Sequence, residues 1–398
     1  MRPKLRAHQR EGLSVQVSPF VQLLICAALG AAVPRAVASE FQPDGVQWAG
    51  SGFATLAAGK VLGGTHDPAT DSGFQCPCMP TDYAHAGVYE RGAWRLGPDS
   101  VLGLQATASL GQTGLSATGQ VVSRGARDGR VNLEWLYATW DINSNWTLQA
   151  GRKRLPILAQ SEVQDVGYAV PWVHLPPQVY GWEIVNYNGA NLLYRGRLGD
   201  VSALVNVFGG SETIEDSPFW KMYDGRAART DSRWSGLAGA ELKLALAGAE
   251  LRGVYITSKT QNRFVTGGDA DYSTPARQHI WGLSASYDES NWVGRAEWIY
   301  INRRQDYGGD RASLVAVGRR FGPWLPMLSW SRYQQLTSTL PDEPAEGHEM
   351  TSVVLRRELA ANSAIKLQLD RWQDRSAPGF AYPHGNRRLF SAAYVRVF

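Results

Sequence analysis

Apolar and polar residues alternate along many segments of this chain with a repeat of two. In residues 291–304, Trp292 and Trp298 share one parity, and Arg295 and Glu297 share the other. A β-strand points successive side chains to opposite faces, so this strand has one apolar face with aromatic residues near its ends and one charged face. A soluble sheet also alternates, but it has no need of aromatic residues at both edges. A membrane barrel places such a face in lipid, with aromatic girdles at the two interfaces.

The alternation recurs along the chain. In residues 131–140, Leu133, Trp135 and Tyr137 are expected to face lipid, opposite Glu134. Together with the positions of turn residues, the pattern predicts sixteen strands, at 47–62, 100–110, 113–124, 130–141, 145–154, 189–198, 200–210, 234–244, 247–259, 277–287, 290–304, 310–321, 323–335, 347–358, 362–375 and 386–398.

The predicted connections alternate in length. Seven are short turns, such as "LGD" and "DESN", whereas those at 63–99, 155–188, 211–233, 260–276, 336–346 and 376–385 are long. Short turns on one rim and long loops on the other are typical of an outer-membrane β-barrel with an even number of strands. The sequence therefore predicts an all-β transmembrane antiparallel barrel with short periplasmic turns and long outer loops.

The chain ends in an alternating strand whose last residue is aromatic. Tyr394 and Phe398 share one parity in "RLFSAAYVRVF". In a closed barrel the last strand pairs with the first, so this end is not free. A terminal Phe in such a strand resembles the signal by which outer-membrane proteins are recognised for assembly, and we assign Tyr394 and Phe398 to it. The alternative is an ordinary edge strand.

Residues 1–38 have the features of an export signal. Four basic residues precede an apolar run at 20–33, and "AVA" at 36–38 has the small-x-small form of a cleavage site. The run is short for a spanning helix, although a buried or anchoring helix is the alternative. The segment holds five of the 40 basic residues and one of the 36 acidic residues, which leaves 35 of each. We therefore expect a barrel at 39–398, located in the outer membrane after cleavage near Ala38, and no nucleic-acid partner.

Residues 133–196 carry a family resemblance. A strand runs into "GRKRLP" and then into a loop rich in proline and aromatic residues, "VGYAVPWVHLPPQVYGW". This segment resembles a proteobacterial subgroup of the Gram-negative general porin superfamily. The resemblance implies a 16-stranded barrel, usually a homotrimer, whose third long loop folds into the lumen. Here that loop is 155–188.

The loop is too apolar to remain in water, so it should pack against something, either inside the lumen or on neighbouring loops. Its acids, Glu162 and Asp165, would then face basic residues of lumen parity. Opposed charges of this kind can select polar solutes, although each charge could simply be solvated. The pore and constriction candidates are Glu162, Asp165, Lys153, Arg195, Arg197, Arg252 and Arg295.

Two cysteines remain after signal removal, Cys76 and Cys78, in the first long loop. An exported protein meets an oxidising compartment, so a disulfide between them is expected. The alternative is a soft-metal site formed by Cys76, Cys78, Met79 and His85, which are all ligand types for such metals.

A catalytic site is not expected. Six histidines survive signal removal, mostly in or near the long loops, and none has a nucleophile motif beside it. We therefore expect no cofactor and no enzyme activity. The leading function is a water-filled channel for passive diffusion of small hydrophilic solutes and ions. The alternatives are a substrate-specific channel and a non-conducting surface or structural barrel.

Small residues predominate on the expected lipid face of the early strands, such as Ala54, Ala106 and Ala117, whereas the late strands carry Trp and Tyr. Close packing in a membrane favours small side chains, and the lipid interface favours aromatic ones. The early strands are therefore expected to form a homotrimer interface, unless small residues merely suit a bent wall. Outer-membrane lipid and lipopolysaccharide are the other expected partners.

Overall fold

The computed structural model describes residues 45–65, 73–303, 308–336, 344–380 and 385–398. The predicted signal peptide at 1–38, His66 and His384 lie outside the described residues, as do parts of three of the long connections and residues 304–307. Within the described ranges, no helix has the length and apolar character needed to span a membrane.

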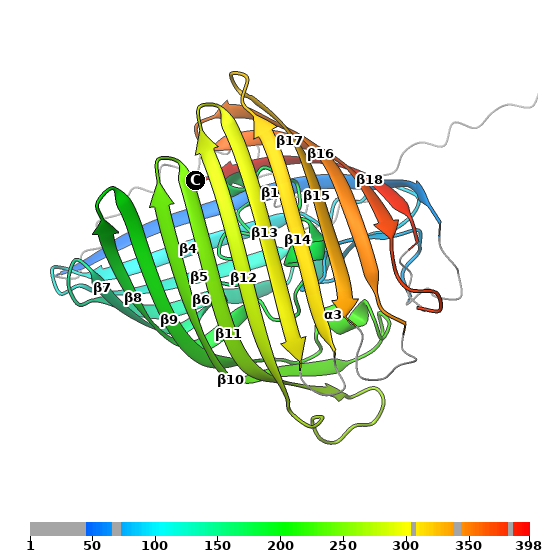
Figure 1. Cartoon of the computed structure of the whole chain (residues 1–398), viewed down its shortest axis with the longest axis horizontal. Helices are drawn as coiled ribbons and strands as arrows, with labels where there is room; N and C mark the ends of the chain where they lie inside the picture. The colour runs from blue at the N-terminus through cyan, green and yellow to red at the C-terminus, as the bar shows by residue number, and fades with distance from the viewer. Residues whose placement is uncertain (1–44, 66–72, 304–307, 337–343, 381–384) are drawn as a thin grey trace, which may run out of the picture.

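Sixteen strands form one closed antiparallel barrel (Figure 1). They are β1 (Val46–Gly64), β4 (Val101–Leu110), β5 (Leu115–Arg124), β6 (Val131–Asp141), β7 (Trp146–Arg154), β8 (Asn186–Leu198), β9 (Val201–Ile214), β10 (Thr230–Leu246), β11 (Ala249–Phe264), β12 (Ala276–Glu289), β13 (Trp292–Arg303), β14 (Gly309–Arg319), β15 (Trp324–Leu336), β16 (Gly347–Ala360), β17 (Ser363–Asp374) and β18 (Arg387–Val397). The predicted strand number and fold class are confirmed, and every predicted segment overlaps one of these strands.

The remaining elements are short and lie in the long connections. β2 (Met79–Asp82) and β3 (Gly87–Tyr89) form a two-stranded sheet, and η2 (Gly125–Arg127) and η3 (Gly167–Ala169) are single 3₁₀ turns. α2 (Pro177–Tyr180) and α3 (Pro218–Lys221) are single helical turns, each of which begins at a proline. α3 lies at the end of the barrel where the long connections gather (Figure 1).

Chain closure explains the ordered C-terminus. β1 pairs with β18 from Phe53 opposite Val397 to Gly64 opposite Arg387. Phe398 extends this ladder, because its N–H donates to the carbonyl of Gly52 at 2.9 Å and its carbonyl accepts from the N–H of Gly52 at 2.7 Å. The ring of Phe398 occupies the space that a Cβ of Gly52 would need.

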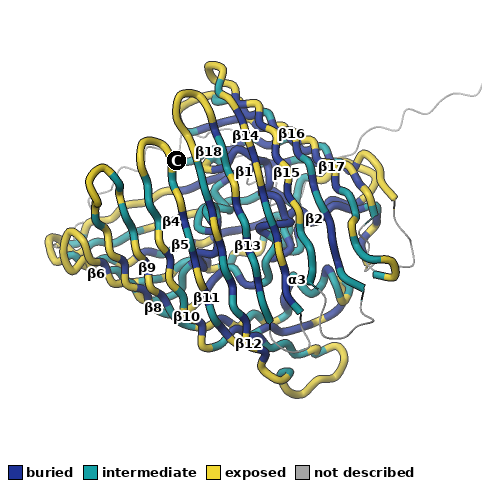
Figure 2. Tube along the Cα trace, viewed as in Figure 1, coloured by how far each residue is buried: buried dark blue, intermediate teal, exposed yellow. Residues whose placement is uncertain are grey.

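The side chains alternate between the two faces as expected, so buried and exposed positions follow one another along many of the strands (Figure 2). In β17, Ile365 and Leu367 are exposed while Lys366 and Gln368 are buried. β6 departs from this pattern.

In β6, the pairing with β5 shifts between Gln120 opposite Trp135 and Val121 opposite Leu133. Two residues of β6 therefore span one step of β5, as in a β-bulge. Leu133 remains on the outer face, but beyond the bulge Leu136 is exposed and Trp135 is not. The expectation that Trp135 and Tyr137 face lipid is wrong, because the extra residue reverses the parity.

A row of small residues crosses the outer face of the early strands. The strand registers place Ala108, Ala117, Ala138, Ala150, Ala190 and Gly209 opposite one another in succession from β4 to β9. We call these six residues the alanine row. The late strands carry aromatic residues instead, and the rings of Trp281 and Tyr300 stack with centroids 5.5 Å apart. Aromatic residues also border the alanine row near the short turns, where Trp48, Trp140 and Trp146 are exposed.

Candidate functional site

The connection between β7 and β8, residues 155–185, packs against the inner wall of the barrel. Among its apolar side chains, Leu155, Trp172 and Ile184 are at most 1% exposed and belong to the largest described apolar cluster. Most of the wall residues in this cluster come from six neighbouring strands and include Val254, Ile256, Ile280, Ile299, Leu314, Met327 and Val354; the others include Tyr187, Phe208, Trp234 and Leu237 of β8 to β10. We call this part of the wall, on β11 to β16, the apolar half.

Gly282 of β12 lets the loop approach closely. A Cβ at this position would lie 2.6 Å from the carbonyl oxygen of Ile157 and 2.7 Å from Val254. Trp172 is fixed by its indole N–H, which donates to Ser329 Oγ at 3.0 Å, and Tyr180 donates its hydroxyl to Glu297 at 2.6 Å. The loop thus occupies the apolar half of the lumen and satisfies its polar groups against the wall.

Three basic side chains of the wall hold the backbone of this loop. Lys366 of β17, which is fully buried, donates to the carbonyls of Gly167 and Trp172, the latter at 2.7 Å. Arg356 of β16 donates to the carbonyls of Tyr168 and Val170 at 2.7 and 3.1 Å. Arg252 of β11 donates to the carbonyls of Leu158 and Pro156, the latter at 3.0 Å. A loop in the lumen has no neighbouring strand to pair its carbonyls, so these cations take that role.

Asp165 is the acid that anchors the loop on the opposite side. Its carboxylate accepts from Arg124 Nη2 of β5 at 2.8 Å and from Arg154 at the end of β7. Arg124 also pairs with Glu134 at 2.7 Å, which makes a buried network of two cations and two anions. Burial disfavours the charged carboxylate, but Arg124 and Arg154 outweigh burial and hold the pKa of Asp165 well below its usual range.

His174 is held between two carboxylates. Its Nδ1 lies 2.9 Å from Asp99 Oδ2, and its Nε2 lies 3.0 Å from Asp370 Oδ2 on β17. A ring that donates from both nitrogens is the imidazolium. Burial opposes the charge, yet the two carboxylates raise the pKa of His174 to about 10. This charged bridge joins the loop to both the first long connection and the wall.

The inner wall that the loop leaves uncovered is polar. Neighbouring strands are linked by side-chain bonds, such as Thr107 to Thr118 at 3.0 Å, Gln120 to Gln105 at 3.0 Å and Asn191 to Asn206 at 3.1 Å. We call the following set the polar strip: Gln105, Thr107, Thr118, Gln120, Thr139, Gln149, Asn191 and Asn206, from β4 to β9. A cavity of about 590 Å³ near the short turns lies between Glu162 and Val166 of the loop and Gln105, Gln120 and Trp135 of the wall, so two residues of the polar strip line it.

Glu162 of the loop lies next to a base of the wall. Its carboxylate lies 3.6 Å from Lys243 Nζ of β10. Lys153 of β7 donates to Gln149 and, at 3.0 Å, to Asn191, and its Nζ lies 5.0 Å from the centre of the Tyr137 ring.

The other predicted wall bases lie elsewhere. Arg195 donates to Thr147 Oγ1 at 2.9 Å, next to the turn at 142–145. Arg295 donates to the carbonyls of Tyr287 and Gly294 beside the turn at 290–291. Arg252 pairs with Glu241 at 2.8 Å in addition to holding the loop backbone, and Arg197 is exposed in β8. Of the seven predicted pore residues, Glu162 pairs with a base of the wall, Lys153 bonds the polar strip, and Asp165 and Arg252 anchor the loop.

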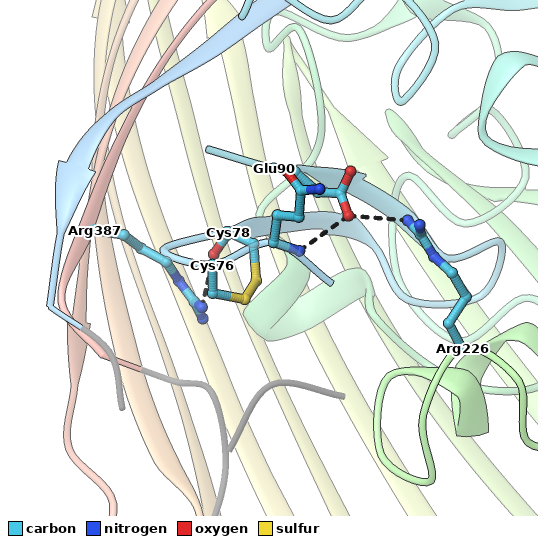
Figure 3. Close-up of a disulfide and its surroundings, with 6 residues drawn as sticks. Cys76, Cys78, Glu90, Arg226 and Arg387 are labelled. Atoms are coloured by element: carbon cyan, nitrogen blue, oxygen red, sulfur yellow. Dashed lines mark hydrogen bonds and ion pairs between the residues drawn. A yellow bond between two sulfur atoms is a disulfide. The ribbon is translucent and has the colours of Figure 1, made fainter. Parts of the chain in front are cut away.

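The first long connection contains a disulfide between Cys76 and Cys78, with an S–S distance of 2.00 Å (Figure 3). Both residues are buried, and the carbonyl of Cys78 accepts from Arg387 Nη1 of β18 at 2.8 Å. Glu90 accepts from the N–H of Gln75 and from Arg226 Nη2, each at 3.1 Å. The connection is thus tied to β18 on one side and to the connection after β9 on the other.

The candidate ligands of the alternative soft-metal site are engaged in other contacts. The sulfurs of Cys76 and Cys78 are bonded to each other, and His85 Nδ1 lies 2.7 Å from Asp82 Oδ2. Met79 is buried in an apolar cluster with Trp372 and Leu389. Among the described residues, no group of three or more His, Cys, Asp or Glu side chains is arranged to hold a metal ion.

Sequence reasoning missed the residues that anchor the loop. Arg124 and Arg154, which bind Asp165, stand at the ends of strands, and His174 was noticed only as one of six histidines. Lys366 and Asp370 alternate with the apolar Ile365, Leu367 and Leu369 in the sequence, but nothing in the sequence pairs them with the loop. Two features together could have identified Arg124 and Arg154. Both have the parity of lumen-facing residues, and both stand at strand ends on the side of the long loops.

Comparisons with known proteins agree with this architecture. No family model matches the chain, and no curated protein matches its sequence. Among solved structures, the outer membrane channel DcaP of Acinetobacter baumannii is similar, with a TM-score of 0.55 and 10% identity over 90% of this chain and 99% of that one. The anion-selective porin from Comamonas acidovorans has a TM-score of 0.53 and 14% identity over 89% of this chain and 100% of that one.

A third similar structure is the trimer form of OmpT, an outer membrane protein of Vibrio cholerae, with a TM-score of 0.55 and 8% identity over 89% of this chain and 100% of that one. At sequence identities this low, structural similarity shows the fold alone. At the level of the fold the resemblance to porins is confirmed: the chain forms a closed 16-stranded barrel of porin-like architecture.

Proposed function

We propose that this protein is an outer-membrane channel through which small hydrophilic solutes and ions diffuse passively. The observation that carries the proposal is the division of the inner wall. The loop covers the apolar half, and the polar strip remains beside a cavity of about 590 Å³. A wall of hydroxyl and amide groups can replace part of the hydration of a passing solute without binding it tightly.

Charges along this path set the expected selectivity. Glu162 projects from the loop, and Lys153 and Lys243 project from the wall opposite it. A solute that passes beside these charges crosses their field, which favours polar over apolar molecules. Asp165, Arg195, Arg197, Arg252 and Arg295 complete the set of pore candidates, with Asp165 and Arg252 acting through the position of the loop.

The protein acts as a channel rather than an enzyme in this proposal. The buried His174 bonds a carboxylate through each ring nitrogen. Neither nitrogen is therefore left to accept a proton from a nucleophile, as a general base must. No cofactor is required for diffusion.

The proposal includes export and membrane insertion. Residues 1–38 would direct the chain across the inner membrane, and the strand that ends at Phe398 would mark it for assembly. The outward faces of the strands would then contact outer-membrane lipid and lipopolysaccharide.

We further propose a homotrimer built on the alanine row. Its small side chains would allow a flat, close contact between subunits, and a closed cyclic assembly uses the same patch on each subunit. The trimer form of the Vibrio cholerae protein supports the stoichiometry. Ala54 is excluded from this contact because it is only 2% exposed within its own barrel.

Single-channel recording in planar lipid bilayers tests the proposal. Ohmic current steps in KCl that no solute blocks are expected for a general diffusion channel, and the reversal potential in a salt gradient gives its ion preference. Block by one class of solute would instead indicate a substrate-specific channel. Absence of conductance from folded protein would contradict both and leave a non-conducting surface barrel.

A further inference from the structure

A second cavity lies at the opposite mouth of the barrel, where the long connections gather. It has a volume of about 580 Å³ and lies between the loop at 155–185, the connection that contains α3, and the ends of β11 and β13 to β16. This volume falls within the range of sites for small organic molecules. The cavity lies between this mouth and the loop, so a solute that enters from this side reaches the cavity before the polar strip.

Aromatic rings form much of the cavity wall. Eight of the lining residues are aromatic: Tyr83, Trp182, Phe219, Trp220, Tyr223, Trp234, Tyr333 and Phe380. Phe219 lies at the centre of a ring cluster, with its centroid 5.0 Å from Tyr223 and 5.6 Å from Trp220. The ring of Trp182 lies 6.4 Å from that of Tyr333 on the other side. Aromatic faces attract cations as well as apolar groups.

The lining holds three acids, Glu183, Asp310 and Glu346, against one arginine and one histidine. Arg303 forms an ion pair with Asp310, which also accepts from the hydroxyl of Tyr333 at 2.7 Å. His348 Nε2 lies 3.3 Å from Glu346. The third acid, Glu183, accepts from the indole N–H of Trp220 and the hydroxyl of Ser232. In the described part of the chain it forms no ion pair, so one carboxyl of the lining has neutral donors only.

We propose that this cavity binds monovalent organic cations that carry an apolar or aromatic body. The cationic group would lie near Glu183, and the body would contact the rings of Trp182 and Phe219. The inference that such cations then enter the channel rests on the proposed function, whereas their binding does not.

Cation binding at this site has a pH dependence. Burial is the main influence on Glu183 and raises the pKa of its carboxyl, while bonds from Ser232 and Trp220 and the charge of Arg303 partly oppose it. A bound cation favours the ionised carboxyl, so affinity rises with pH through the titration of Glu183. The cavity is also lined by Asp310, Glu346, His348 and Arg303. Glu183→Gln therefore removes only the part of the pH dependence that comes from Glu183.

The test compares three probes of similar size on detergent-solubilised full-length protein. Benzyltrimethylammonium, benzyl alcohol and benzenesulfonate share a ring and differ in charge. Isothermal titration calorimetry and quenching of tryptophan fluorescence should show saturable binding of the ammonium, about tenfold or more tighter than benzyl alcohol. Glu183→Gln, whose amide oxygen can still accept from Trp220, should weaken ammonium binding about tenfold and remove most of its pH dependence.

The matched control is Glu349→Gln, on the same rim of the barrel but outside the cavity, where Glu349 pairs with the exposed Arg375. This control should bind the ammonium as the parent does. Phe219→Leu provides a second variant in case Glu183→Gln does not fold, and it should also weaken binding. Equal or tighter binding of benzyl alcohol or benzenesulfonate, or unchanged ammonium affinity in both variants, would overturn the proposal. Conductance in KCl, recorded separately, tests the channel itself.

Discussion

The anchoring of the loop by Asp165 gives a prediction whose size follows from the structure. Asp165→Asn keeps the shape of the side chain and removes one of the two negative charges that face Arg124 and Arg154. The side chains of these arginines are only 2% and 3% exposed, so the lost charge is not replaced by water. Removing one partner of a buried ion pair typically costs about 3–5 kcal/mol. Because about 1.4 kcal/mol corresponds to a factor of ten, local opening of the loop should become about a hundred- to a few thousand-fold more frequent.

Hydrogen exchange measured by mass spectrometry on the peptide 158–170 reads this equilibrium directly. The N–H groups of Ser161, Val163 and Val166 are bonded within the loop, at 2.9–3.1 Å, and exchange only when it opens. The control is Glu162→Gln, a change of the same type three residues away. Its carboxylate pairs with Lys243 and its side chain is 43% exposed, and exposed pairs contribute only about 0–1 kcal/mol.

Exchange in Asp165→Asn should therefore exceed both the parent and Glu162→Gln by about two orders of magnitude or more. Similar exchange in Asp165→Asn and the parent, or an equal effect of the two substitutions, would refute the reasoning.

The pH dependence of loop docking has a definite sign. The pKa of Asp165 is depressed in the docked loop, so its contribution is present above the ordinary value of 3.8 and is lost as pH falls below it. After correction for intrinsic exchange, protection should be constant from about pH 5 to about pH 6.5, below the window in which His174 titrates, and should fall in acid.

Three further predictions concern other parts of the barrel. The pKa of His174 is raised to about 10 from an ordinary value of 6.5, so its contribution to loop docking is complete below pH 6.5 and is lost as pH rises through 10. Hydrogen exchange of the Val173 amide should therefore rise over this window in the parent. A His174→Gln variant with the same pH profile would contradict the assignment. Phe398→Ser should lower the amount of barrel assembled in the outer membrane without changing the single-channel conductance of folded molecules, and equal surface abundance would count against an assembly role. Ala117→Trp combined with Ala150→Trp should weaken a detergent-stable trimer on native gels, and a parent protein that is monomeric with full conductance would show that the alanine row is not an interface.

The architecture could be predicted from the sequence because each strand carries its own signal. A period of two, aromatic residues near the strand ends and alternating loop lengths are local features, and they identified all sixteen strands. The exception in β6 has a physical cause. A β-bulge adds one residue to a strand and leaves its composition unchanged, so Trp135 and Tyr137 looked like lipid-facing residues until the register with β5 was known.

The interior was harder to predict because it depends on the path of one loop. Basic residues of the wall were expected to face the acids of the loop, and Asp165 does meet two arginines. Lys366, Arg356 and Arg252 bind backbone carbonyls of the loop instead. Every residue has a carbonyl, so no residue type marks this contact in a sequence, and the pairing between Asp165 and Arg124 joins positions 41 residues apart.

The accessibility of the two sides of the lumen tests the central claim most directly. Cys76 and Cys78 are joined in a disulfide, so a cysteine introduced at Gln105, on the polar strip, or at Ile280, under the loop, would be the reactive thiol of the described barrel. Single-channel current is recorded in a planar bilayer while a small charged methanethiosulfonate reagent is added. A path along the polar strip predicts a stepwise fall in current for Gln105→Cys and no change for Ile280→Cys. Modification of Ile280→Cys with Gln105→Cys unaffected would place the path on the other side of the loop and contradict the account.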